Sequence, residues 1–166
     1  GLMTDTETDR SWPHMIYNVG TTITMEAWDA KYKPNLDWNH AWGAAPANII
    51  PRYLMGIQAV EPGFAKVRIK PQVGPLESGR IELPTIRGTI RVDFTQARDR
   101  SFSLNVRTPA GVEAVVYLPR LGHDDPGVLV NGQTVEATLA GGFAVLDGIG
   151  PGAHRFERSS TLAQKD

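Results

Sequence analysis

The sequence predicts a mainly β protein in which an antiparallel β-sandwich follows two or three helices. From Pro62 onward, short alternating or β-branched runs of residues are separated by Gly, Pro and Asn, a pattern typical of strands joined by turns. The turn signals recur about every 8 to 12 residues, as they do in sandwiches and barrels. In residues 1–57, by contrast, the apolar residues follow a helical spacing.

One helix is predicted to end near residue 57. Four apolar residues fall at positions i, i+3, i+4 and i+7 and therefore share one helical face: Ile50, Tyr53, Leu54 and Ile57. Pro46 fits the first turn, where its missing N–H is not needed, and Gly56 weakens the helix near its end. Pro51 is expected to kink the helix or confine it to two pieces.

A second helix is predicted at residues 15–28, because Ser11, Trp12 and Pro13 precede it as a start signal. The β-branched run at residues 21–24 is a poor helix former in its middle.

The remaining elements are all predicted to be strands. They are expected at residues 64–70, 79–86, 89–96, 101–107, 112–118, 127–130, 134–139, 143–149 and 152–158. Asn131 and Gly132 predict a type I′ hairpin turn between two of them. Strict alternation places Ile90, Val92 and Phe94 on one face of their strand. Two packed antiparallel sheets are the natural arrangement for so many short strands.

The helices of the first part cannot bury their apolar faces by themselves. They must lie on the sandwich, on a second copy of this chain, or on a helical domain outside this chain, and we favour the last. Exposed apolar helix faces also predict self-association, for example as a homodimer. The chain begins with Gly1 and has no hydrophobic start, which we interpret as a cleaved tag or an excised fragment.

Composition argues against several classes of protein. Seventeen basic and eighteen acidic side chains give a net charge of −1, without a block of like charge that could follow a phosphate backbone or a membrane surface. We therefore expect neither nucleic acid nor a membrane as a partner. No apolar run approaches the roughly 18 to 20 residues that cross a bilayer, so a soluble chain is expected.

Cysteine and histidine usage bears on redox and metal chemistry. The chain has no cysteine, which excludes disulfides and thiolate ligands but leaves bacterial cytoplasm, periplasm and secretion all open. Four histidines lack any paired ligand spacing: His14, His40, His123 and His154. We expect no metal and no cofactor.

Two neighbouring segments concentrate the residues that carry chemistry. Residues 20–29 and 37–43 together hold Glu26, Asp29, Asp37, His40 and three of the tryptophans. Aromatic faces stack on sugar rings, while carboxylates and imidazole bind hydroxyls or move protons, so this mixture suits a carbohydrate pocket. A partly buried helix and loop with ordinary packing aromatics is the alternative interpretation.

These segments resemble, in order, the C-terminal end of the bacterial α-L-rhamnosidases of glycoside hydrolase family 78. Residues 20–29, GTTITMEAWD, are similar to the family's G-A-T-T-x-W-E-x-W-D, and residues 37–43, DWNHAWG, to its Asn-His segment. Residues 52–57, 62–64 and 69–71 are similar to the R-Y-x-x-G-I, P-G-[FY] and I-x-P series that leads into the family's C-terminal sandwich.

The resemblance implies both a fold and an activity. Such enzymes have a catalytic (α/α)₆ six-hairpin barrel with flanking sandwiches and release terminal α-L-rhamnose with inversion. Residues 1–57 would then be the last helices of an incomplete barrel, residues 62–158 the C-terminal sandwich and residues 159–166 a disordered tail. The substrate would be a rhamnoside, and the missing N-terminal barrel would be a partner of this chain.

The resemblance also implies roles for particular residues. Glu26 takes the position of the general base, and Met25 and Trp28 around it are expected to raise its pKa by partial desolvation. His40 takes the position of a histidine that binds a rhamnose hydroxyl. All four tryptophans, Trp12, Trp28, Trp38 and Trp42, could stack on the sugar or pack in a core, and Trp28 and Trp12 are chosen as the candidates. Asp29 and Asp37 are interpreted as helix-end or loop acids.

Two departures from the family pattern qualify these roles. Met25 stands where the family has Trp, which removes an aromatic wall and leaves a barrel hydrolase for another sugar as an alternative. The family's general acid lies upstream of this chain, so the fragment is expected to be inactive alone. A non-catalytic carbohydrate-binding or structural sandwich is a further alternative, although every tryptophan precedes residue 43 and none lies in the predicted strands.

Overall fold

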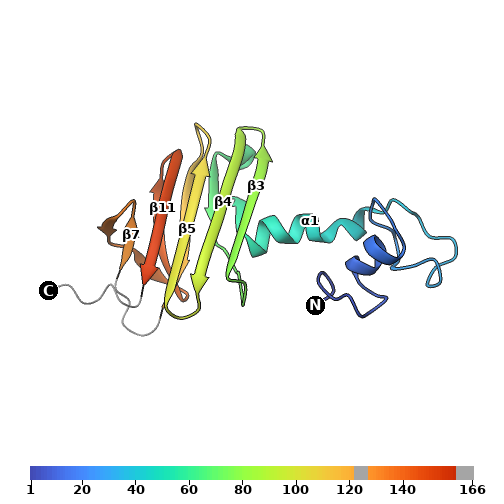
Figure 1. Cartoon of the computed structure of the whole chain (residues 1–166). Coiled ribbons are helices and arrows are strands. Elements are labelled where there is room, and N and C mark those ends of the chain that lie inside the picture. The colour runs from blue at the N-terminus through green and yellow to red at the C-terminus, as the bar shows by residue number, and fades with distance from the viewer. Residues whose placement is uncertain (122–126, 160–166) are drawn as a thin grey trace. The chain divides into compact units, whose positions relative to one another are not determined.

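The computed structural model describes residues 1–121 and 127–159 and divides into two compact units, Gly1–Ile49 and Ile50–Asp166 (Figure 1). Residues 160–166 of the predicted tail lie outside the described residues. Ser159, also predicted to be disordered, is instead the last residue of a strand that pairs along its whole length. No helix within the described ranges is long and apolar enough to cross a bilayer.

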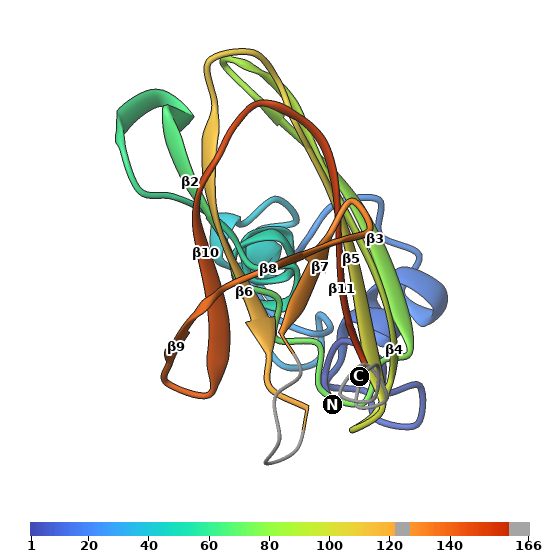
Figure 2. The same cartoon turned by 90° about the vertical axis from the view of Figure 1, so that its left-hand side faces the viewer.

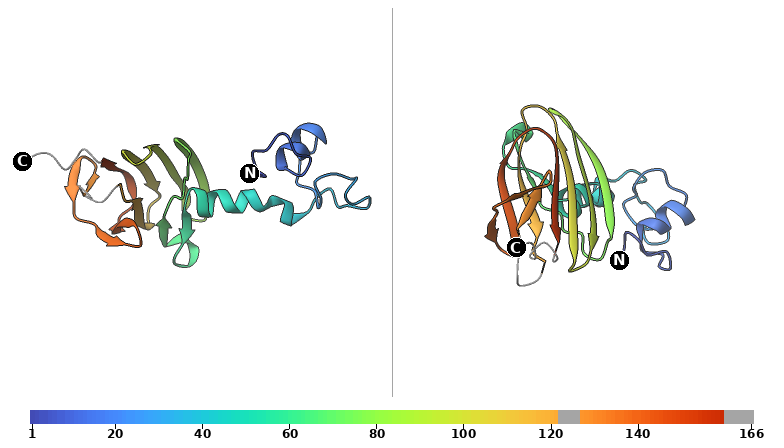
Figure 3. Two further views of the ribbon diagram at one scale, coloured as in Figure 1. Left: turned by 90° about the horizontal axis from the view of Figure 1, so that it is seen from below. Right: turned by 60° about the vertical axis from the view of Figure 1, so that its left-hand side comes forward.

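The first unit consists mostly of loops around short helical turns. Among its residues the helical elements are η1 (His14–Asn18, a π-helix), η2 (Ala41–Ala44, a 3₁₀ helix) and α1 (Ala45–Ile49). Figure 3 shows η1 in blue and the loops that follow it. Three buried residues, Met15, Met25 and Leu36, form a small apolar cluster. Trp12 and Trp28 pack against this cluster at its edge.

The predicted helix at residues 15–28 is wrong beyond its first turn. Gly20 has φ +76°, outside the helical region, and ends the helical path before the β-branched run begins. Both the backbone N–H and the hydroxyl of Thr21 donate to the carbonyl oxygen of Met15, at 3.0 and 2.9 Å. A threonine that bonds back to the chain in this way competes with helix formation.

The predicted helix near residue 57 consists of two helical elements that follow each other without a gap, and Pro51 lies within the second. The α-helical pattern of α1 ends at Ile49, and η3 (Ile50–Leu54) continues with π-helical bonding. Ile57 does not belong to this helix, contrary to the prediction, because Gly56 turns the chain at φ +75°. A Cβ at Gly56 would overlap the carbonyl group of Lys70, so only glycine fits this close approach.

The second unit is a β-sandwich whose two sheets face each other (Figure 2). Among the described residues, one sheet has the order β1-β2-β6-β10-β9 and the other β3-β4-β5-β11-β7-β8. The strand bounds are β1 Ile57–Ala59, β2 Lys66–Ile69, β3 Ser78–Thr85, β4 Gly88–Ala97, β5 Ser101–Thr108, β6 Glu113–Pro119, β7 Val128–Val130, β8 Gln133–Val135, β9 Thr138–Ala140, β10 Phe143–Ile149 and β11 Gly152–Ser159. A short 3₁₀ helix, η4 (Pro62–Phe64), joins β1 to β2.

The strand predictions hold with three differences. The strand β1 was not predicted, and the segment predicted at 134–139 forms two strands, β8 and β9, which lie in different sheets. Strands β2 and β6 pair in parallel, whereas all pairing was expected to be antiparallel. The predicted type I′ turn is confirmed, because Asn131 and Gly132 have φ values of +52° and +82° between paired strands.

One continuous apolar core fills the space between the two sheets. Ile90, Val92 and Phe94 point into it together, as the alternation predicted, and are at most 1% exposed. On the neighbouring strand β3, Gly79 leaves room for the Phe94 ring, which a Cβ at that position would approach to 2.5 Å. The core cluster draws on strands of both sheets, so the sandwich has the architecture of an independently packed domain.

Candidate active-site segment

The two segments that carry chemistry lie side by side within the first unit. The backbone N–H of Glu26 donates to the carbonyl oxygen of Asp37 at 2.9 Å, and the N–H of His40 donates to that of Thr24 at 2.9 Å. The Thr24 hydroxyl adds a bond of 3.3 Å to the carbonyl oxygen of His40. These bonds fix the position of Glu26 relative to His40 although neither segment is regular secondary structure.

Gly43 allows the two segments to approach each other. A Cβ at this position would lie 2.6 Å from the carbonyl oxygen of Met25 and 2.8 Å from the Cβ of Thr24. The carbonyl oxygen of Gly43 accepts a 2.7 Å hydrogen bond from the indole N–H of Trp12. Gly43 therefore joins both segments to the chain that precedes η1.

A cavity of about 230 Å³ lies between these segments. Its walls include Trp12, Met25, Glu26, Trp28 and Trp42. Its volume is below the range typical of pockets for drug-sized ligands, so it suits one small group. Apolar and aromatic walls around a single carboxylate are a common composition for a ligand pocket.

The tryptophans of the cavity differ in how they are held. Trp12 and Trp28 pack edge to face with their ring centres 4.8 Å apart, which fixes both rings as part of the wall. Trp42 is 65% exposed and lies against the His40 ring at 4.3 Å. Its indole N–H donates to the backbone carbonyl of Glu26 at 3.2 Å. Sequence analysis named Trp42 as one of four tryptophans that could stack on sugar but chose Trp28 and Trp12 instead.

The Glu26 carboxylate is 11% exposed and has three polar neighbours. Lys33 forms an ion pair with Oε1, and the backbone N–H of Asp37 donates to Oε2 at 3.1 Å. The imidazole Nε2 of His40 is 4.0 Å from Oε1. The hydrogen bond from Lys33, followed by that from Asp37, lowers the pKa of Glu26 below its usual value. The expectation of a raised pKa is therefore wrong, because the ammonium group outweighs the desolvation.

Sequence analysis missed Lys33 because it belongs to no motif. Lys33 lies in an irregular loop, seven residues after Glu26, and only the path of that loop brings its ammonium group to the carboxylate. No periodicity in the sequence signals this contact.

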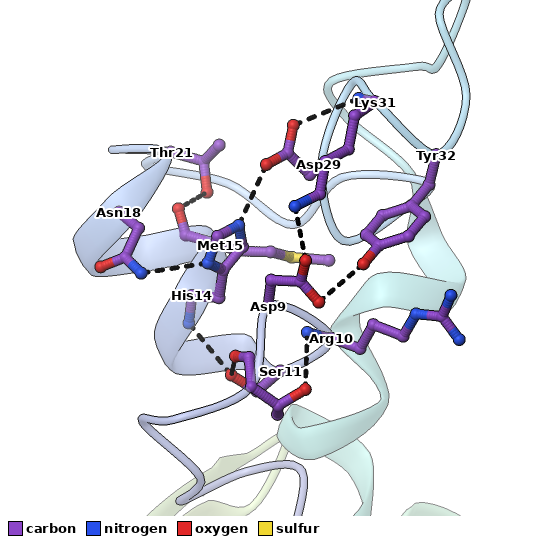
Figure 4. Close-up of polar contacts among 11 residues, drawn as sticks. Asp9, Arg10, Ser11, His14, Met15, Asn18, Thr21, Asp29, Lys31 and Tyr32 are labelled. Carbon is purple, nitrogen blue, oxygen red and sulfur yellow. Dashed lines mark hydrogen bonds and ion pairs between the residues drawn. The ribbon is translucent and has the colours of Figure 1, made fainter.

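A further group of polar side chains surrounds His14 in η1, the residue before Met15, which lines the cavity (Figure 4). The Nε2 of His14 is 3.1 Å from a carboxylate oxygen of Asp29, and its Nδ1 is 3.0 Å from the side-chain amide of Asn18. A carboxylate only accepts, so Nε2 donates to Asp29 and Nδ1 accepts from Asn18. Hydrogen bonds from His14 and the Lys31 backbone lower the pKa of Asp29.

The acid Asp9 extends the same group of polar side chains. Its carboxylate pairs with the ammonium group of Lys31 and accepts a 2.6 Å hydrogen bond from the Tyr32 hydroxyl. The Lys31 bond, then the Tyr32 bond, lowers the pKa of Asp9 to about 2. These contacts tie the chain before η1 to the loop after Trp28. Within the described ranges, His, Asp and Glu side chains form no group of three that could hold a metal ion.

Two family models match the chain in succession. Residues 2–54 match the bacterial alpha-L-rhamnosidase 6 hairpin glycosidase domain, and residues 56–130 match the bacterial alpha-L-rhamnosidase C-terminal domain. The two matches meet near residue 55, close to the point where the sequence changes from helical spacing to short strand-like runs. No curated protein matches the chain.

Solved structures of α-L-rhamnosidases share the fold. The enzyme from Dictyoglumus thermophilum aligns over 94% of this chain with a TM-score of 0.79 and 22% identity. The Streptomyces avermitilis enzyme, solved with L-rhamnose, aligns over 94% with a TM-score of 0.73 and 25% identity. The Aspergillus terreus enzyme gives 94%, 0.68 and 21%. This chain spans only 18%, 15% and 16% of their respective lengths.

Proposed function

We propose, from the homology of this chain to the bacterial α-L-rhamnosidases, that it supplies the general-base side of the active site of an inverting glycoside hydrolase. The parent enzyme would release terminal α-L-rhamnose from glycans or glycosides. The residues before Ile57 would complete an (α/α)₆ barrel, and the C-terminal sandwich, predicted at 62–158, would run from Ile57 in β1 to Ser159 in β11. The proposal rests on one observation above all: Glu26 stands on the wall of a tryptophan-lined cavity, next to His40.

The surroundings of Glu26 suit a base that must be ionised before it acts. Inversion requires a carboxylate that activates water on the face of the sugar opposite the leaving group. Lys33 and the Asp37 N–H lower the pKa of Glu26 below its usual value, so the carboxylate stays ionised at neutral pH despite its partial burial. The same bonds weaken it as a base, so we propose that water or substrate displaces Lys33, whose side chain is 41% exposed, from the carboxylate.

We propose that His40, Trp28 and Trp12 bind the sugar. The 4.0 Å between the His40 Nε2 and the Glu26 Oε1 would let one hydroxyl or one water bond to both groups. The Trp12 and Trp28 rings are held rigidly by each other, which would reduce the entropy lost when a sugar stacks on them. We propose that Trp42 also binds the sugar, because its ring lies against that of His40.

The remainder of the active site would come from chain that precedes these residues in the parent. An inverting enzyme needs a second carboxyl group about 6.5–9.5 Å from the base to protonate the leaving oxygen. General-acid assistance is typically worth about 10²–10⁴-fold. We therefore propose that this chain alone does not hydrolyse rhamnosides.

The test is hydrolysis of an aryl α-L-rhamnoside by the full-length parent protein, unmodified and as Glu26→Gln. Loss of the base should lower kcat by about 10²–10⁴-fold. Glu7→Gln is the matched control, because Glu7 lies in an exposed loop outside the cavity, and it should leave kcat unchanged.

Two results would contradict the proposal. Near-normal activity of Glu26→Gln would make Glu26 a structural charge. An unmodified parent that leaves rhamnosides intact but cleaves another aryl glycoside would point to a barrel hydrolase for that sugar, the alternative that Met25 leaves open.

A further inference from the structure

The outer face of the sheet β3-β4-β5-β11 carries a polar groove, and we propose that it binds an acidic oligosaccharide whose carboxylates pair with its arginines. The groove has a volume of about 480 Å³. Its cations are Arg80, Arg91, Arg107 and Arg155, and we call it the arginine groove. It lies entirely within the sandwich, on strands that Figure 1 shows side by side, and the proposal does not depend on rhamnoside hydrolysis.

Strand register builds the arginine groove as two parallel rows of side chains. Across the first row, Arg80 pairs with Asp93, Asp93 with Asn105, and Asn105 with Arg155. Asp93 and Asn105 alternate with buried core positions on β4 and β5, so they face outward, and Arg80 and Arg155 lie beside them on the same face.

The second row lies two residues away from the first on the same face, two residues later on β3 and β5 and two residues earlier on the antiparallel β4. There Glu82 pairs with Arg91, and Arg91 pairs with Arg107. The two rows run perpendicular to the strands and together form a band across four of them, which is a shape suited to an extended chain.

The charges in the band are not balanced. Glu82 accepts from both Arg80, at 2.9 Å, and Arg91, at 3.1 Å, so one carboxylate serves two guanidinium groups. Arg155 pairs with Glu157 at 2.8 Å, whereas the guanidinium of Arg107, directly opposite Arg91, has no ion-pair or hydrogen-bond partner among the described residues. Like charges directly opposite each other on neighbouring strands are destabilising. An anion between Arg91 and Arg107 would remove that repulsion.

The carboxylates that line the groove limit which anionic ligands it can bind. Asp93 and Glu82 are carboxylates, and each would repel the continuous negative charge of a nucleic acid. The hydroxyls of a sugar can donate to these carboxylates, and a sugar carboxylate can accept from the planar guanidinium groups in a bidentate manner. A chain with hydroxyls and spaced carboxylates satisfies both requirements.

The groove lacks the features of a site for a neutral sugar. None of the described residues that line it is Phe, Tyr or Trp, and its one aromatic ring is the small imidazole of His154, so it lacks the broad apolar face on which a pyranose stacks. Recognition must therefore come from charge and hydrogen bonds, which predicts a marked dependence on salt.

The test is titration calorimetry of the 166-residue chain with tetragalacturonate, beside the fully methyl-esterified tetramer as a neutral probe. We expect binding of the acid, weakened at least about tenfold between about 0.1 M and about 1 M NaCl, and none of the ester. The variant Arg107→Gln/Arg155→Gln should weaken binding of the acid at least about tenfold.

Arg98→Gln is the matched control, because Arg98 is 81% exposed and lies outside the groove, and it should leave affinity within about twofold. Thermal unfolding of each variant verifies that the sandwich is folded. The proposal is overturned if the acid does not bind, if the ester binds equally well, or if Arg107→Gln/Arg155→Gln binds the acid as tightly as the unmodified chain does. Since no readout involves hydrolysis, these outcomes are independent of the role of Glu26.

Discussion

The two units of this chain bury their apolar residues in different ways. The sandwich has one continuous core that takes side chains from both sheets, many of them fully buried. The first unit has a cluster of three buried apolar residues, while five of its large apolar side chains are more than half exposed: Leu2, Ile16, Tyr17, Trp38 and Trp42. Burial of apolar side chains between its two sheets therefore stabilises the sandwich, whereas the first unit depends largely on hydrogen bonds and ion pairs between its loops.

This contrast agrees with the small share of the solved rhamnosidases that the chain covers. We propose that upstream chain of the parent covers the exposed apolar side chains of the first unit. Self-association through the same side chains stays a prediction. All four tryptophans lie in the first unit, so tryptophan fluorescence reports on the unfolding of that unit alone.

The largest effect is expected in the core of the sandwich. Phe156 is fully buried in β11, and Phe156→Ala should lower the free energy of unfolding by about 3–5 kcal/mol because it removes contacts and leaves a cavity. Urea unfolding followed by far-ultraviolet circular dichroism measures this change. Leu139→Ala, at a position that is 54% exposed, is the control and should cost under about 0.5 kcal/mol. Equal losses in both variants would break the contrast.

Gly43→Ala tests whether a close approach holds the first unit together. The added methyl group would meet the Met25 carbonyl at 2.6 Å and should cost about 1–3 kcal/mol through overpacking. Tryptophan fluorescence should show an earlier unfolding transition, while the circular dichroism transition of the sandwich stays where it was. Gly1→Ala, where nothing lies within 4 Å, is the matched control. An unchanged fluorescence transition in Gly43→Ala would mean that the two segments do not require this contact.

A smaller effect is expected at the hairpin turn of the sandwich. Asn131 holds φ +52°, and its side-chain oxygen accepts from the backbone N–H of Arg155 at 2.9 Å. Asn131→Ala should therefore cost about 1 kcal/mol, seen by circular dichroism and not by fluorescence. Asn131→Gly separates the two causes, because glycine relieves the backbone strain but still lacks the hydrogen bond. If Asn131→Gly loses as much as Asn131→Ala, the hydrogen bond alone matters.

Acid should affect the first unit through Asp9. The folded pKa of Asp9, about 2, lies below its ordinary value of 3.8, so its contribution to stability is present above pH 3.8 and is lost as the pH falls toward 2. The fluorescence transition should shift to lower urea concentrations over this window, and Asp9→Asn should reduce that shift. Asp5→Asn is the control carboxylate in the same loop. A shift that is identical in Asp9→Asn would show that Asp9 does not contribute.

The sequence patterns that correctly predicted core positions and the hairpin turn are those that depend only on neighbouring residues. Alternation placed Ile90, Val92 and Phe94 in the core, and Asn131-Gly132 gave the type I′ turn, because side-chain direction and left-handed backbone are local properties. The helix predicted at 15–28 is wrong beyond its first turn because Gly20 leaves the helical region and Thr21 bonds back to the carbonyl oxygen of Met15.

By itself, the sequence determined the sandwich, its strand positions and the two segments that carry Glu26 and His40. Only the tertiary structure decided which distant groups meet. Lys33 reaches Glu26 along an irregular loop and reverses the expected pKa shift; β2 pairs in parallel with β6; and Arg107 comes to stand opposite Arg91. The physical reason is that these contacts depend on loop path and strand register, which packing of the whole chain selects and no local periodicity encodes.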